Sequence, residues 1–73
     1  MFTFVSVASW GYGDCAGQGI IYVGNDKTEA TKRLTDFVFP DDSNNYGWIE
    51  TWENGKEIKH EYIRERKQKR LYL

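Results

Sequence analysis

The chain has 73 residues and a net charge of −1, which predicts one small domain and leaves no room for a second. Its single cysteine, Cys15, excludes the disulfide framework that holds small secreted domains together. The start, Met1–Val7, has no basic leader, and nothing approaches the twenty apolar residues of a membrane span. We therefore expect a cytoplasmic protein with no membrane partner.

The first third of the chain predicts two strands joined by a glycine-rich loop. Residues 2–9 alternate so that one face carries Thr3, Val5, Val7 and Ser9, and the other carries Phe2, Phe4, Ser6 and Ala8. Apolar residues on both faces are typical of a central strand. The loop covers residues 9–19, and the short β-branched run 20–23 predicts the second strand.

A helix is predicted after Asn25. Asp26 suits the N-cap position, and Glu29 stands three residues later, as in a capping box. An apolar stripe at i, i+4, i+7 and i+8 is formed by Ala30, Leu34, Phe37 and Val38. Pro40 is expected to end the helix, and a turn-rich loop follows it.

The segment 48–60 predicts a β-hairpin around Asn54-Gly55, a pair that suits a two-residue type I′ turn. Such a turn fixes the expected pairs, which are Glu53 with Lys56, Thr51 with Ile58, Glu50 with Lys59, and Ile49 with His60. Alternation then places Ile49, Thr51, Ile58 and His60 on one face. The other face carries Trp48, Glu50, Trp52, Glu57, Lys59 and Glu61.

The element order β-β-α-β-β predicts an α+β fold, a four-stranded and mostly antiparallel sheet with one helix packed on one face. If the helix covers the face of Ile49, Thr51 and Ile58, then Tyr46, Trp48 and Trp52 share the open face. The alternative is that the helix lies on the tryptophans. The sequence leaves both arrangements open.

Charge is unevenly distributed along the chain. Residues 1–63, the predicted domain, hold five Lys/Arg against ten Asp/Glu, whereas residues 64–73 form a basic C-terminal arm with a net charge of +4. The segment 62–70 could extend the last strand, form a short helix or lack regular structure.

Four pieces of the chain form a recognisable layout: Ser9-Trp10-Gly11-Tyr12-Gly13-Asp14, the strand 20–23, the helix with Ala30 and Phe37, and Ile49-Glu50-Thr51-Trp52. This layout resembles small uncharacterised proteins of phages and their bacterial hosts. The resemblance implies the same β-β-α-β-β fold and a mobile-element origin, with the host cytoplasm as the location. It supplies no catalytic residues. The glycines up to Gly19 and the basic arm fall outside the pattern.

Two sets of residues are candidate binding sites. A partner-binding site is predicted from exposed aromatic residues and the arm, namely Tyr46, Trp48, Trp52, Arg64, Arg66, Lys67, Lys69 and Arg70. A ligand site in the glycine-rich loop is the alternative, with Trp10, Gly11, Tyr12, Gly13 and Asp14 stacking on a base and offering backbone N–H groups to a phosphate. The same residues also have an explanation that involves no binding site: the aromatic side chains could pack in the core, and the glycines could form ordinary turns.

Catalysis and metal binding are not predicted. Cys15 and His60 lack any local signature of a nucleophile and base, and one Cys with one His falls short of a closed metal site. We expect no cofactor. Nucleic acid is the less favoured partner, since the acidic body opposes it.

The residues predict a non-enzymatic binding protein that acts by direct contact. The resemblance implies that it is phage-type and inhibits a host protein, such as an antiviral-defence component. An open aromatic face on a small core also predicts a homodimer. The alternative function is an oligomeric sponge that sequesters a nucleotide signal.

Overall fold

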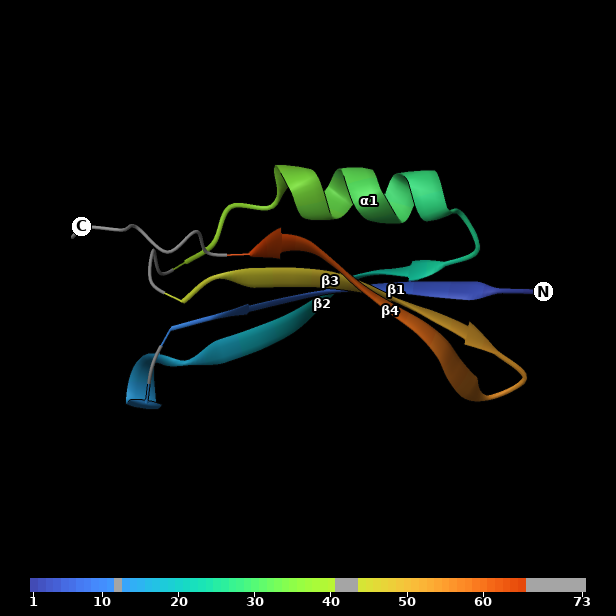
Figure 1. Cartoon of the computed structure of the whole chain (residues 1–73). Coiled ribbons are helices and arrows are strands. Elements are labelled where there is room, and N and C mark those ends of the chain that lie inside the picture. Colours follow the sequence, from blue (N-terminus) through green and yellow to red (C-terminus); the bar gives the residue numbers. More distant parts are fainter. Residues whose placement is uncertain (12, 41–43, 66–73) are drawn as a thin grey trace, which may run out of the picture.

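The computed structural model describes residues 1–11, 13–40 and 44–65. The elements follow in the order β1 (Thr3–Trp10), the short 3-10 helix η1 (Gly13–Cys15), β2 (Gly17–Gly24), α1 (Lys27–Asp36), β3 (Tyr46–Glu53) and β4 (Lys56–Glu65). The strands form one antiparallel sheet in the order β2-β1-β3-β4, and α1 lies across one side of it (Figure 1). The predicted α+β fold class is confirmed.

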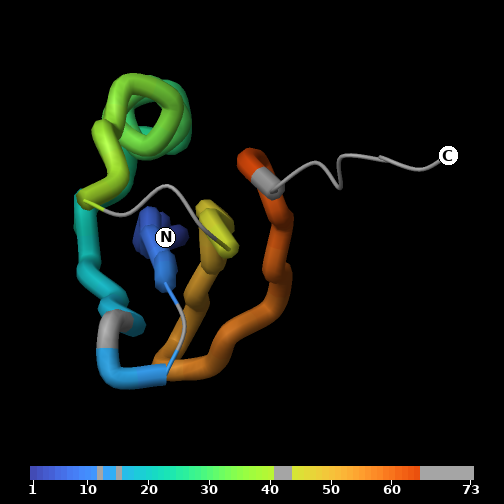
Figure 2. The backbone as a smooth tube through the Cα atoms, turned by 90° about the vertical axis from the view of Figure 1, so that its left-hand side faces the viewer, coloured from blue at the N-terminus to red at the C-terminus, as the bar shows by residue number. Residues whose placement is uncertain are grey.

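The arrangement of the strands follows from this order. In Figure 2 the helix is seen end-on, and β1 and β3 run between β2 on one side and β4 on the other. The predicted hairpin of β3 with β4 is present, β1 and β2 form a second hairpin, and the strands β1 and β3 pair at the centre of the sheet. β1 is therefore a central strand, as its apolar residues on both faces predict.

The turn between β3 and β4 has the conformation that its sequence predicts. Asn54 has a φ of 54° and Gly55 a φ of 79°, the two positive values of a type I′ turn. Glu53 pairs with Lys56, as expected. Trp52 with Glu57 continues the same register, and agreement ends at Thr51.

A β-bulge at Ile58 makes the other predicted pairs wrong. Trp52 pairs with Glu57 and Thr51 pairs with Lys59, so Ile58 is an extra residue on β4. From there the register is displaced by one, and Glu50 pairs with His60 and Ile49 with Glu61. His60 therefore lies on the face of Glu50 and the tryptophans, whereas Lys59 and Glu61 lie on the other face. Ile58, expected in the core, is 52% exposed.

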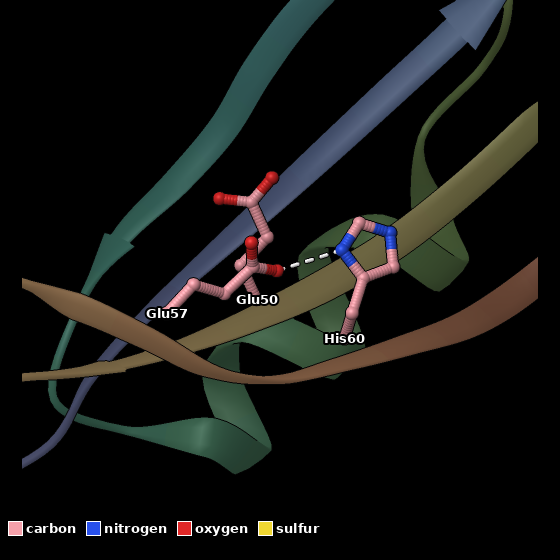
Figure 3. A group of neighbouring side chains, drawn as sticks. All are labelled: Glu50, Glu57 and His60. Atoms are coloured by element: carbon pink, nitrogen blue, oxygen red, sulfur yellow. Dashed lines mark hydrogen bonds and ion pairs between the residues drawn. The ribbon is translucent and has the colours of Figure 1, made fainter.

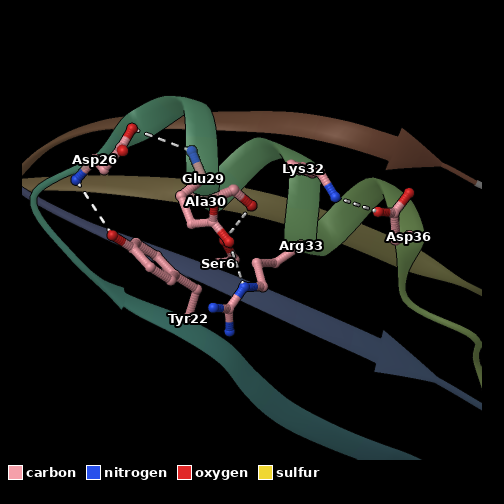
Figure 4. Close-up of polar contacts among 8 residues, drawn as sticks. All are labelled: Ser6, Tyr22, Asp26, Glu29, Ala30, Lys32, Arg33 and Asp36. Atoms are coloured by element: carbon pink, nitrogen blue, oxygen red, sulfur yellow. Dashed lines mark hydrogen bonds and ion pairs between the residues drawn. The ribbon is translucent and has the colours of Figure 1, made fainter.

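The helix begins as predicted and ends early. The N-cap Asp26 accepts a hydrogen bond from the backbone N–H of Glu29 at 3.2 Å, and ion pairs line the exposed side of the helix (Figure 4). The chain leaves the helix at Phe37, which is extended at φ −66° and ψ 135°. Val38 consequently misses the apolar stripe and is 84% exposed, which corrects the prediction that it is buried.

The hydrophobic core lies between α1 and the sheet. Its buried centre is Ala8, Ala30, Leu34 and Ile49, and the side chains packed around it are Phe4, Trp10, Ile21, Tyr22, Phe37 and Phe39. The buried Ser6 Oγ donates to the carbonyl oxygen of Ala30 at 2.7 Å and ties β1 to the helix (Figure 4). The helix thus covers the face of Ile49 and Thr51, the first of the two arrangements that the sequence left open.

β4 continues to Glu65, two residues past the predicted end of the domain at residue 63. The rest of the predicted arm lies outside the described residues. Within the described ranges, no helix has the length and apolar character that a membrane crossing requires.

Candidate functional site

The side of the sheet away from α1 carries the candidate site. Alternation along β3 places Ile49 and Thr51 under the helix, so their neighbours in sequence point the other way. We use the name open face for this side, formed by Tyr46, Trp48, Glu50 and Trp52 of β3 and by Glu57, His60 and Tyr62 of β4.

A continuous row of rings runs along the open face. The Trp48 ring stacks on His60 with centroids 5.5 Å apart and an interplanar angle of 22°. Tyr62 lies 5.6 Å from Trp48 and 5.2 Å from His60, and Tyr46 lies 6.2 Å from Tyr62. These separations fall in the range of favourable aromatic pairs. The rings therefore support one another in fixed positions.

Glu50 holds both tryptophans of β3. Its Oε2 accepts a hydrogen bond from Trp48 Nε1 and its Oε1 accepts one from Trp52 Nε1, each at 2.9 Å. Residues 48, 50 and 52 share a face because side chains alternate along a strand. One carboxylate therefore orients two indole rings, and each of its oxygens keeps further acceptor capacity.

The open face is partly exposed. Tyr62 is 52% exposed, and Tyr46, Trp48 and Trp52 are half-buried. Trp48 pairs across the sheet with Val7, which is buried although it points away from the helix. The tryptophan thus covers β1 with one part of its ring and presents the remainder to solvent.

The charge of the open face is negative. Among the residues that define it, Glu50 and Glu57 are the carboxylates, and His60 Nδ1 lies 2.7 Å from Glu57 Oε2. One donor atom each from Glu50, Glu57 and His60 lie within 4.8 Å of one another, and Figure 3 shows the three side chains projecting from β3 and β4 on the same side of the sheet. This trio could hold a metal ion.

The predicted partner-binding residues separate into three groups. Tyr46, Trp48 and Trp52 lie together on the open face, as expected. Arg64 does not join them: its Nη1 donates to the carbonyl oxygens of Leu34, Thr35 and Phe37 at 3.1, 3.4 and 2.7 Å. Its guanidinium lies 4.6 Å from the Phe39 ring centroid, so Arg64 caps the end of α1. The remaining members, Arg66, Lys67, Lys69 and Arg70, lie outside the described residues.

The glycine-rich loop does not present its tryptophan as a free stacking platform. Trp10 packs against Phe37 at 5.9 Å and Phe39 at 6.3 Å, at the edge of the core. Gly11 is buried, and the exposed Gly13 and Asp14 belong to η1, while Tyr12 lies outside the described residues. Nucleotide binding by this loop stays a prediction, and the packing of Trp10 does not favour it.

Sequence reasoning missed four members of the open face as site residues: Glu50, Glu57, His60 and Tyr62. The spacing Trp-x-Glu-x-Trp at residues 48–52 was an available signal, because it puts a carboxylate between two indoles on one face. No comparable signal locates His60, whose position depends on the bulge at Ile58.

Comparison with models of known protein families found no match, and comparison with curated proteins and with solved structures found no similar chain. The resemblance to small phage proteins stays a prediction.

Proposed function

We propose that this protein is a non-enzymatic binding protein that acts by protein–protein contact through the open face. In the phage setting that the resemblance implies, the partner is a host protein, such as an antiviral-defence component. Inhibition then follows because the bound protein occupies a surface that the host factor needs.

The observation that carries the proposal is the ordered row of partly exposed rings. Trp and Tyr dominate the energetics of protein interfaces, because they bury a large area at a small entropic cost. Here Glu50 fixes two of the rings by hydrogen bonds, His60 stacks on Trp48, and Tyr62 contacts Trp48 in a tilted arrangement. Side chains that are held before binding lose little further freedom when a partner arrives.

The negative charge of the open face defines the chemistry of the partner. Glu50 and Glu57 form ion pairs with no Lys or Arg among residues 1–11, 13–40 and 44–65. A partner surface with an apolar centre and basic residues around it complements this arrangement. We therefore expect a host protein that presents arginine or lysine beside an apolar pocket.

Affinity capture from a bacterial host lysate, followed by binding measurements with the purified captured protein, tests the proposal. We expect the Trp48→Ala/Trp52→Ala variant to weaken binding at least 100-fold, since two interface hot spots of about 2 kcal/mol or more are removed. The matched control is Lys32→Ala/Asp36→Ala, which removes an exposed ion pair on the opposite side of the molecule. The control should bind like the wild type.

Tyr62→Ala guards against a loss of binding that reflects misfolding. Tyr62 is 52% exposed, so its removal leaves the core intact while it takes one ring from the row. We expect a native circular dichroism spectrum and binding weakened about tenfold. Equal affinities for the wild type, the double tryptophan variant and Tyr62→Ala would refute the open face as the contact surface.

A further inference from the structure

We propose that Glu50, Glu57 and His60 form a Zn²⁺ site on the open face. The donor atoms come from two neighbouring strands, β3 and β4, and lie within 4.8 Å of one another (Figure 3). The proposal concerns metal binding by the chain alone. It therefore stands or falls independently of the partner contact proposed above.

The donor set fits zinc in kind and in number. Zn²⁺ binds imidazole nitrogen and carboxylate oxygen at about 2.0–2.2 Å, and sites with three protein ligands take water as the fourth. A tetrahedral site of that size has ligand atoms about 3.4 Å apart. His60 Nδ1 and Glu57 Oε2 lie 2.7 Å apart and the three donor atoms lie within 4.8 Å of one another, so the observed separations are of the same size as this spacing.

Electrostatics favour a cation at this position. Two carboxylates face the same small volume, and within the described part of the chain neither makes an ion pair with a Lys or Arg, while Glu57 contacts the His60 imidazole. Lys59, although adjacent to His60, points to the other face and pairs with Glu61. A divalent ion between Glu50 and Glu57 offsets both charges at once.

Two ligands are oriented by groups outside the trio, which is the usual arrangement around a metal. The Glu50 carboxylate accepts an indole N–H on each oxygen, and the His60 ring is stacked on Trp48. Hydrogen bonds of this kind fix ligating side chains and strengthen metal binding. The bulge at Ile58 is the backbone feature that turns His60 to the side of Glu50.

The imidazole distinguishes zinc from the hard cations. Mg²⁺ and Ca²⁺ prefer sites made of oxygen ligands, whereas a nitrogen ligand beside carboxylates suits Zn²⁺. We expect one Zn²⁺ per chain with a dissociation constant on the order of micromolar, because the ligands are partly exposed. Mg²⁺ at the same concentration should leave the site empty.

Isothermal titration of the full chain with ZnCl₂ tests the proposal, with tryptophan fluorescence as a second readout because Trp48 stacks on His60. Glu57→Gln and His60→Ala should each weaken Zn²⁺ binding at least tenfold. Their side chains are exposed, so both variants should keep the native circular dichroism spectrum. Glu53→Gln, which removes a carboxylate elsewhere on β3, and Cys15→Ser, which removes the thiol, are the controls and should bind Zn²⁺ like the wild type.

The proposal is overturned if the wild type shows no saturable Zn²⁺ binding in this range. It is equally overturned if His60→Ala and Glu57→Gln bind as tightly as the wild type, or if Cys15→Ser alone abolishes binding. If the wild type binds Zn²⁺ saturably but binds its partner no more tightly than the tryptophan variants do, the proposed function is refuted and the metal site stands.

Discussion

At the residue scale, Glu50 determines the shape of the open face. Its two oxygens each accept one indole N–H at 2.9 Å, and both donors come from residues two positions away on the same strand. A hydrogen bond to a charged group contributes more than a neutral one, typically about 1.5–3 kcal/mol. The orientation of Trp48 and Trp52 therefore depends on a carboxylate at this position.

Replacing Glu50 with Gln should destabilise the fold. The glutamine oxygen can accept one indole N–H, but its NH₂ group then faces the other N–H, a donor opposite a donor. We expect a decrease of about 1–2 kcal/mol in the free energy of unfolding, measured by urea denaturation. Glu53→Gln makes the same charge change on the same strand and should cost less than about 0.5 kcal/mol. Equal losses in the two variants would contradict this role of Glu50.

At the element scale, the closeness of α1 to β3 depends on a glycine. A Cβ atom added at Gly47 would lie 2.9 Å from Leu34 Cδ1 and 3.1 Å from Leu34 Cγ. Leu34 is fully buried in the core, so it has little room to move away. The small residue at position 47 lets the helix pack directly on the strand.

Gly47→Ala should therefore destabilise the protein by about 1–3 kcal/mol through overpacking. Gly19→Ala is the matched control, because its added Cβ would have its nearest neighbour, Trp10 Cη2, at an ordinary 3.8 Å. The control should be neutral or slightly stabilising, since alanine restricts the unfolded chain. Thermal unfolding of both variants measures the difference. A wild-type melting temperature for Gly47→Ala would contradict the close packing.

An ion pair also connects α1 to β4 and gives stability a dependence on pH. Lys27 Nζ lies 2.8 Å from Glu61 Oε1, and this hydrogen-bonded ammonium, together with the charge of Lys59, lowers the pKa of the Glu61 carboxyl below its ordinary value. A carboxyl with a lowered pKa in the folded state stabilises the fold above its unfolded pKa, near 4.3. That contribution is lost as the pH falls from there through the folded pKa.

Comparing the wild type with Glu61→Gln across pH tests the ion pair. Between pH 6 and pH 8 the wild type should be more stable by about 0.5 kcal/mol, as is usual for a partly exposed pair. The difference should be constant in this window and should shrink as the pH falls below about 4.5. A difference that grows on acidification would contradict the assignment.

Local sequence signals were sufficient to predict the helix and the strands, but not the register in which the strands pair. The Asn54-Gly55 turn and the Asp26 cap were predictable, because each depends on the conformational preference of one or two residues. The bulge at Ile58 was not, since it depends on which residues of β4 fit beside β3 and under α1. The carbonyl oxygens at the early end of the helix likewise find a donor in Arg64, which is distant in sequence.

The candidate site shows the same division. Tyr46, Trp48 and Trp52 were correctly placed together, because alternation within β3 alone decides their face. Tyr62 and His60 come from the neighbouring strand, so their place beside Trp48 depended on the cross-strand register that the sequence did not reveal. Arg64 has the charge expected of a binding arm, but its guanidinium donates a hydrogen bond to a carbonyl oxygen at the end of α1.

At the scale of the whole molecule, one helix covers one side of a four-stranded sheet, and the other side presents the ring row. Exposed apolar residues extend beyond the row along the edge strand β2, where Ile20 is 66% and Val23 59% exposed. Exposed apolar surface is a feature of many contact sites, so we expect this side of the sheet to be the one that meets a partner. A second copy of the chain can bind to the same surface to which a host partner would bind.

We expect self-association at concentrations on the order of tens of micromolar. Sedimentation velocity over a dilution series should show a weight-average mass that rises toward the dimer with concentration. Trp48→Ala/Trp52→Ala should remain monomeric over the same range, and Lys32→Ala/Asp36→Ala should associate like the wild type. Identical profiles for wild type and the tryptophan variant would exclude the open face from the dimer contact.

Hydroxyl-radical footprinting of the free protein and of its complex with the captured host protein tests the docking surface most directly, because it reports the solvent accessibility of each aromatic side chain. The account predicts that Trp48, Trp52 and Tyr62 react in the free protein and become protected in the complex, while Tyr22, on the helix side of the sheet, is unchanged. Protection of Tyr22 and the α1 surface, with Trp48, Trp52 and Tyr62 reacting as before, would contradict it.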